Sequence, residues 1–169
     1  MPFGLFKKKN KETIKAEESK PHDSGQKTVF EDAFMEIQEG LIALSMELAG
    51  SVPVDEIYVY GSIEDGAYSF NAFYVKKGQV LPTHKINEDL PTIKQFLQLG
   101  SHDLIRLEEV CREYDRPVPN ELKLHYIVGG GLDAHYEYES ICGPESGISP
   151  TDVFRNWRER VAKEMLRRN

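Results

Sequence analysis

The chain has 169 residues, enough for one domain of ordinary size, and 40% of them are hydrophobic, which is enough for a core. No apolar run approaches the roughly 20 residues that span a bilayer, which argues against stable membrane insertion. Residues 1–27 carry seven Lys and four Asp or Glu, whereas residues 28–169, with 14 basic and 24 acidic residues, have a formal charge of −10. An acidic body repels nucleic acid and attracts basic partners, although the same charge also serves solubility.

Residues 1–27 are predicted to be a disordered basic tail, and residues 28–169 a single α+β domain. In the tail the apolar residues precede the lysines, the reverse of a secretory signal, so we expect a cytoplasmic protein. The lysines Lys7 to Lys9 behind Phe3 to Phe6 could touch an anionic surface or simply be solvated. Two cysteines without a Cys-x-x-Cys spacing are expected to be free thiols.

The first helix is expected to begin at Thr28, because Thr28 and Glu31 match a capping box. Gly50 and Pro53 should end it. Its apolar residues recur at spacings of three and four: Phe30, Phe34, Ile37, Leu41, Leu44 and Leu48. This stripe is shorter than three heptads, so packing against a sheet is favoured over a coiled coil.

Three strands are expected next, over residues 56–60, 67–76 and about 79–86. The dipeptides Asp65-Gly66 and Lys77-Gly78 predict tight turns between them. Pro82 has no backbone N–H to donate, so it indicates an edge position for the third strand. Strands joined by tight turns run antiparallel.

A second helix is expected over residues 91–114, with Gly100-Ser101 marking a kink or a break. Residues 122–128 and 132–139 then alternate in polarity around Gly129-Gly130-Gly131, which predicts a hairpin rather than a phosphate loop, because no helix follows the glycines directly.

The hairpin register can be estimated from the turn. If Val128 pairs with Leu132, then Lys123 lies opposite Glu137, and His125 lies opposite His135. This register places the opposite charges of Lys123 and Glu137 across from each other, and it leaves the polar face of the hairpin exposed to solvent.

The last helix is predicted to start at Ser149, with Pro150 at its first position and Asp152 near the positive end of the helix dipole. It carries the only tryptophan, Trp157, on its apolar side. The element order is therefore α-β-β-β-α-β-β-α. We predict an α+β fold with a single, mostly antiparallel five-stranded sheet and helices on one face.

No catalytic motif is legible in the chain, and we predict no catalytic residues and no cofactor. The pair His125 and His135 could hold zinc if Asp133 or Glu137 converged on it, but an exposed polar face explains these residues as well. Cys142 with a distant histidine could form a dyad, although the segment around it does not match a nucleophile elbow. A small metal- or cysteine-dependent enzyme therefore stays an alternative.

Five segments carry a resemblance to a known family: Ile57 to Tyr60, Phe70 to Tyr74, Pro119 to Leu124, Tyr136 to Glu139 and Pro150 to Trp157. In their order and residue types they resemble the YezG-like immunity family of bacterial antitoxins, which are encoded beside polymorphic toxins. The resemblance covers roughly residues 29–166. The resemblance implies inhibition of a cognate toxin domain by direct binding, without turnover. A basic nuclease is the kind of toxin that an acidic protein would attract fastest.

We therefore expect an immunity protein, with a non-enzymatic regulatory or adaptor domain as a second interpretation. Tyrosine is favoured both in strands and at interfaces, and acidic residues interleave with the tyrosines on the predicted open face of the sheet. The expected toxin contacts lie on that face and its rims: Tyr58, Tyr60, Glu64, Asp65, Asp133, His135, Glu137 and Glu139.

Overall fold

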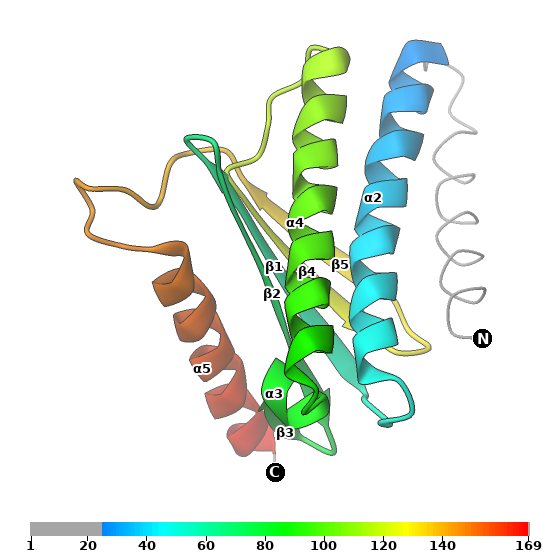
Figure 1. Cartoon of the computed structure of the whole chain (residues 1–169), viewed down its shortest axis with the longest axis vertical. Coiled ribbons are helices and arrows are strands. Elements are labelled where there is room, and N and C mark those ends of the chain that lie inside the picture. Colours follow the sequence, from blue (N-terminus) through cyan, green and yellow to red (C-terminus); the bar gives the residue numbers. More distant parts are fainter. Residues whose placement is uncertain (1–24, 169) are drawn as a thin grey trace.

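A computed structural model describes residues 25–168 of the protein (Figure 1), and the tail predicted over residues 1–27 lies outside this range except for its last three residues. The elements follow the predicted order, with one additional short helix. They are α2 (Gly25–Ala49), β1 (Glu56–Glu64), β2 (Ala67–Lys76), β3 (Gln79–Pro82), α3 (Thr83–Ile86), α4 (Leu90–Glu113), β4 (Glu121–Ile127), β5 (Leu132–Glu137) and α5 (Pro150–Arg168).

The five strands form one antiparallel sheet in the order β3-β2-β1-β4-β5, which confirms the predicted α+β class. Helices α2 and α4 lie side by side on one face, whereas α5 lies on the other (Figure 1). The sequence predicts all helices on one face, which is wrong for α5. The difference arises because the seven inner residues of β1 are all buried, so both faces of this central strand need apolar cover.

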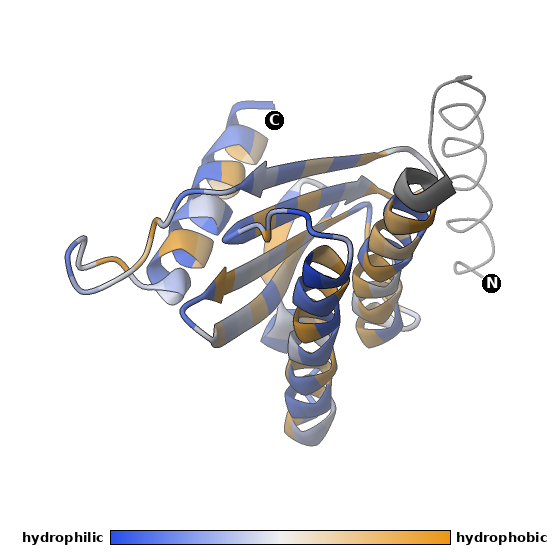
Figure 2. Ribbon diagram, turned by 90° about the horizontal axis from the view of Figure 1, so that it is seen from above, coloured by the Kyte–Doolittle hydropathy of each residue, from blue (hydrophilic) through white to orange (hydrophobic). Residues whose placement is uncertain are grey.

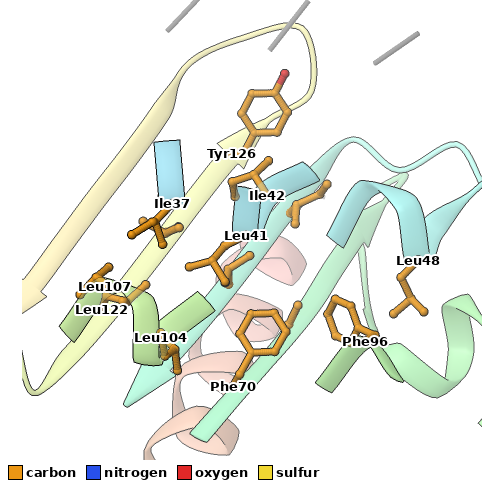
Figure 3. Close-up of a cluster of buried hydrophobic side chains, with 14 of the residues drawn as sticks. Ile37, Leu41, Ile42, Leu48, Phe70, Phe96, Leu104, Leu107, Leu122 and Tyr126 are labelled. Carbon is orange, nitrogen blue, oxygen red and sulfur yellow. The ribbon is translucent and has the colours of Figure 1, made fainter. Parts of the chain in front are cut away.

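The main core lies between the sheet and the helices α2 and α4 (Figure 3). Leu41 and Ile42 of α2 and Leu104 and Leu107 of α4 are fully buried. They meet strand residues such as Leu122, which point to the same side of the sheet. Tyr74 also enters this core and donates its hydroxyl to the carbonyl of Ser45 at 2.7 Å, which ties β2 to the C-terminal part of α2.

A second, smaller cluster lies between α5 and the opposite face of the sheet. Its buried members are Tyr58, Tyr60, Phe73, Val75, Phe154, Val161 and Met165. Figure 2 shows α5 on its own side of the sheet, and bands of hydrophobic and hydrophilic colour alternate along the strands. The two clusters are separated by the sheet itself, so α5 is stabilised independently of α2 and α4.

The start of the first helix and the end of the third strand were predicted wrongly. Helix α2 already includes Gly25, so Thr28 lies inside it and does not cap it. Strand β3 ends at Pro82, and residues 83–86 form α3 instead of more strand, because proline cannot donate to the ladder. The predicted edge position of Pro82 is confirmed.

None of the helices within residues 25–168 is both long and apolar enough to cross a membrane.

Gly100 does not interrupt α4, which runs unbroken from Leu90 to Glu113. A Cβ atom at position 100 would lie only 2.0 Å from Cδ2 of Phe70. The glycine therefore allows the helix backbone to approach the ring on β2 closely. Its role is packing, and not the kink expected from the sequence.

Candidate functional site

The β4–β5 hairpin has a different register from the predicted one. Lys123 lies opposite His135, and His125 lies opposite Asp133. Val128 does not pair with β5, because its N–H donates to the carbonyl of Asp55 at 2.9 Å. The shift is two residues, and side chains alternate with a period of two, so every side chain keeps its predicted face.

We call one surface of this hairpin the hairpin face. It consists of the side chains that β4 and β5 present on the α5 side of the sheet: Glu121, Lys123, His125, Asp133, His135 and Glu137. Helix α5 packs over β2 and β3 and leaves these positions beside it. Asp133 and His135 are exposed, and the side chain of Glu137 is 39% exposed.

Residues opposite one another form rows that cross four strands. From β2 to β5, the rows are Phe73–Tyr58–His125–Asp133, Asn71–Tyr60–Lys123–His135 and Ser69–Ser62–Glu121–Glu137. In the first two rows the β1 tyrosine is buried beneath α5, whereas the β5 residue is in solvent. Each of these rows therefore links the aromatic cluster to the hairpin face.

The first row contains an aromatic stack. The Tyr58 ring lies between Phe73, with centroids 4.6 Å apart, and His125, with centroids 4.1 Å apart, and both pairs are nearly parallel. Trp157 contacts Tyr58 and Phe73 edge-on. Such stacked and edge-on pairs fix ring orientation beyond simple burial. His125 is thus held rigidly at the border of the hairpin face.

Two side chains of the face, His125 and Lys123, have carboxylate partners close by. Glu56 Oε1 lies 2.7 Å from His125 Nε2 and also accepts a hydrogen bond from Tyr58 Oη at 3.2 Å. Lys123 Nζ lies 3.2 Å from Glu121 Oε1 and 5.4 Å from the centroid of the Trp157 ring. Burial, followed by the nearby carboxylate of Glu56, raises the pKa of Tyr58, so this hydroxyl remains a hydrogen-bond donor.

Glu64 organises the loop that follows β5. Its carboxylate accepts hydrogen bonds from Ser140 Oγ at 2.7 Å and from the N–H groups of Ile141 and Cys142, each at 3.0 Å. Partial burial acts to raise the pKa of Glu64, but these hydrogen bonds outweigh it and lower the pKa below its ordinary value.

Glu64→Gln is expected to loosen this loop, because an amide cannot accept hydrogen bonds at both of its terminal atoms. A carboxylate whose pKa is lowered on folding adds to the free energy of unfolding at pH values above its unfolded pKa of about 4.3. This contribution is lost as the pH falls through the folded pKa. At pH 7 we expect a loss of about 1 to 3 kcal/mol and faster amide exchange at Ile141 and Cys142. The difference from wild type should shrink below about pH 4.

The exposed neighbour Glu139 provides the control for this measurement. Glu139→Gln should change the free energy of unfolding by less than about 0.5 kcal/mol. Unchanged exchange at Ile141 and Cys142 in the Glu64→Gln protein would show that the carboxylate does not hold the loop.

The structure brings together only some of the predicted contact residues. Asp133, His135 and Glu137 share the hairpin face, as the alternation predicted. Tyr58 and Tyr60 were predicted to be open, but they are 6% and 1% exposed because α5 covers them, so they cannot contact a partner in this structure.

The remaining predicted contacts lie at the rim. Asp65 is exposed in the tight turn after β1, where its φ of 49° and the φ of 75° at Gly66 confirm the turn prediction. Glu139 is exposed just beyond β5. Both can contact a partner, whereas Glu64 is occupied by the loop.

Two observations bear on the metal- and cysteine-dependent alternatives. Within residues 25–168, no three His, Cys, Asp or Glu side chains gather in a way that could hold a metal ion. His125 and His135 are on different rows. Burial, followed by the Glu64 carboxylate, raises the pKa of the Cys142 thiol to about 11, which is the opposite of what an activated nucleophile requires.

Sequence reasoning missed two contributors to the site. Glu56 starts β1 and shares the α5 side of the sheet with His125, but this pairing depends on β1 lying beside β4, which local sequence does not reveal. Lys123 is predicted in the hairpin, but its approach to Trp157 follows from the placement of α5.

No family model matches the chain, and no curated protein matches its sequence.

Proposed function

We propose that the protein is a cytoplasmic immunity protein that neutralises a cognate toxin domain by binding it through the hairpin face and the adjoining rim. The observation that carries this proposal is the uncovered surface beside α5, where Asp133, His135 and Glu137 are held on a rigid sheet. The pairing of β5 with β4 holds the backbone of these residues in place, so little backbone entropy is lost when a partner binds.

The charge distribution supports a basic partner. Helix α5 has six Arg or Lys and three Asp or Glu. Residues 28–149, which include the hairpin face, have 8 basic and 21 acidic residues. A basic toxin, such as a nuclease domain, would therefore be steered towards this acidic part of the chain and away from α5. The resemblance to the YezG-like family agrees with this mode of action.

The experiment takes the product of the gene next to the one for this chain as the candidate toxin, and uses it both in a growth-protection assay and in stopped-flow association. The double variant Asp133→Lys and Glu137→Lys should slow association by at least about ten-fold at low salt, because each change reverses a charge on the face. The wild-type association rate should also fall as salt rises from about 50 to 500 mM.

A matched control reverses two exposed charges on the opposite side of the molecule. Glu36→Lys on α2 and Glu109→Lys on α4 change the net charge by the same amount. This control should keep most of the wild-type rate. Equal slowing in the two double variants would show that net charge acts without the hairpin face, and a wild-type protein that neither binds the toxin nor protects cells would overturn the proposal.

A further inference from the structure

The two edges of the sheet differ in their protection. Strand β3 has four residues, includes Pro82, and packs against α3 and α5. Strand β5 has six residues without Pro or Lys, and Ala134 in its middle is exposed. Natural proteins commonly block an edge with proline, lysine or a covering element, because an open edge is a template for another strand. Within residues 25–168, only β3 has such protection.

The backbone groups of β5 alternate between the sheet and the open side. Ile127 N–H donates to the Gly131 carbonyl at 3.1 Å, and Asn120 N–H donates to the Glu137 carbonyl at 2.8 Å, so these odd-numbered positions face β4. The N–H and C=O of Leu132, Ala134 and Tyr136 therefore point away from the sheet. Among the described residues, no strand pairs with this side of β5.

We propose that this edge pairs with β5 of a second copy of the chain, antiparallel and centred on Ala134, which would join the two sheets into one. In this register Asp133 lies opposite His135 of the partner subunit, and the reciprocal pair repeats it. On the other face Leu132 lies opposite Tyr136 of the partner subunit. A carboxylate opposite an imidazole and an apolar residue opposite a tyrosine are both favourable cross-strand pairs.

Other two-fold registers fit less well. Centring on His135 places that residue opposite itself and Asp133 opposite Glu137 of the partner subunit, so two carboxylates oppose each other. Centring on Tyr136 requires Tyr138, which lies beyond the end of β5. The Ala134 register instead uses all three outward-facing residues, for about six backbone hydrogen bonds, with the smallest side chain on the axis.

The joined sheet would place both hairpin faces on the same side, because the two-fold axis of a continuous antiparallel sheet is perpendicular to it. Asp133 and His135 of each copy would then meet at the centre of one wider acidic surface. The proposed dimer does not depend on the proposed function. The use of this wider surface for toxin binding does depend on the proposed function. A contact limited to one strand pair is small, so we expect micromolar self-association.

Sedimentation of the full chain tests the proposal over about 1 to 500 µM, a range that brackets micromolar association. The weight-average mass should rise from 19.3 kDa towards twice that value. Ala134→Pro removes an outward N–H that β4 does not use, and it should weaken association by at least about ten-fold while retaining the fold. Amide exchange at Leu132, Ala134 and Tyr136 should slow with concentration, whereas the odd-numbered amides stay protected throughout.

A charge exchange provides the second variant. His135→Asp alone places two carboxylates opposite each other across the axis and should weaken the dimer, whereas Asp133→His combined with His135→Asp should restore it. A wild-type chain that keeps its monomer mass at the highest concentration would overturn the proposal, as would an Ala134→Pro protein that associates like wild type. If the wild-type chain is monomeric and the folded Ala134→Pro variant no longer binds the toxin, the open edge of β5 would instead be assigned to pairing with a strand of the toxin.

Discussion

Gly100→Ala should lower the free energy of unfolding by about 3 kcal/mol, the upper part of the range for overpacked cores. The added Cβ would lie 2.0 to 2.3 Å from three carbons of the Phe70 ring. That ring is 6% exposed and packs against Phe96 at 5.0 Å between centroids, so it has little room to move. Urea unfolding followed by circular dichroism measures the loss.

Gly40→Ala is the matched control, since Gly40 also lies inside a long helix. A Cβ there would have its nearest neighbour, Asp103 Oδ2, at an ordinary 3.7 Å. The higher helix propensity of alanine should then raise stability by up to about 1 kcal/mol. Combining Gly100→Ala with Phe70→Leu should recover part of the loss. A Gly100→Ala protein as stable as the Gly40→Ala protein would contradict the close approach.

Phe154→Ala is expected to weaken the docking of α5 by about 3 to 5 kcal/mol, the usual cost of truncating a buried aromatic side chain. Phe154 is 6% exposed and contacts Tyr60 and Phe73, with ring centroids 5.9 and 5.8 Å apart. Trp157, one turn further along α5, is the only tryptophan in the chain and reports on this docking. Its emission should shift to the red in the folded variant, while the helical signal from α2 and α4 persists.

Leu166→Ala on the same helix is the control, because Leu166 is 75% exposed. It should change stability by less than about 0.5 kcal/mol and leave the Trp157 emission unchanged. If Phe154→Ala lost all helical signal together with the Trp157 shift, the two apolar clusters would unfold as one unit, and the independence of α5 would be wrong.

The local signals in the sequence predicted the elements well, because they depend on neighbouring residues. Ser149 caps α5 as predicted, since Asp152 N–H donates to Ser149 Oγ at 3.1 Å. The structure adds the reciprocal bond, in which Ser149 N–H donates to Asp152 Oδ2 at 3.0 Å. The alternation in β5 correctly assigned Asp133 and Tyr136 to opposite faces. Alternation is local, so a register error of two residues did not disturb it.

The parts that failed depend on contacts between distant segments. Tyr58 and Tyr60 have the same local pattern whether their face is open or covered, and only the placement of α5, some 90 residues later in the chain, decides it. Gly100 is indistinguishable in sequence from a helix-weakening glycine until Phe70 is seen against it. The pairing of Glu56 with His125 likewise required the order of the sheet.

The strand order also has a consequence for how the chain emerges during synthesis. β1 is the first strand made and becomes the central one, but its neighbour β4 follows only after α4, and α5 is made last. Until α5 docks, the face of the β1–β2–β3 meander that carries Tyr58, Tyr60 and Phe73 lacks its cover. A nascent chain stalled before Pro150 would therefore expose an aromatic surface of the kind that chaperones bind.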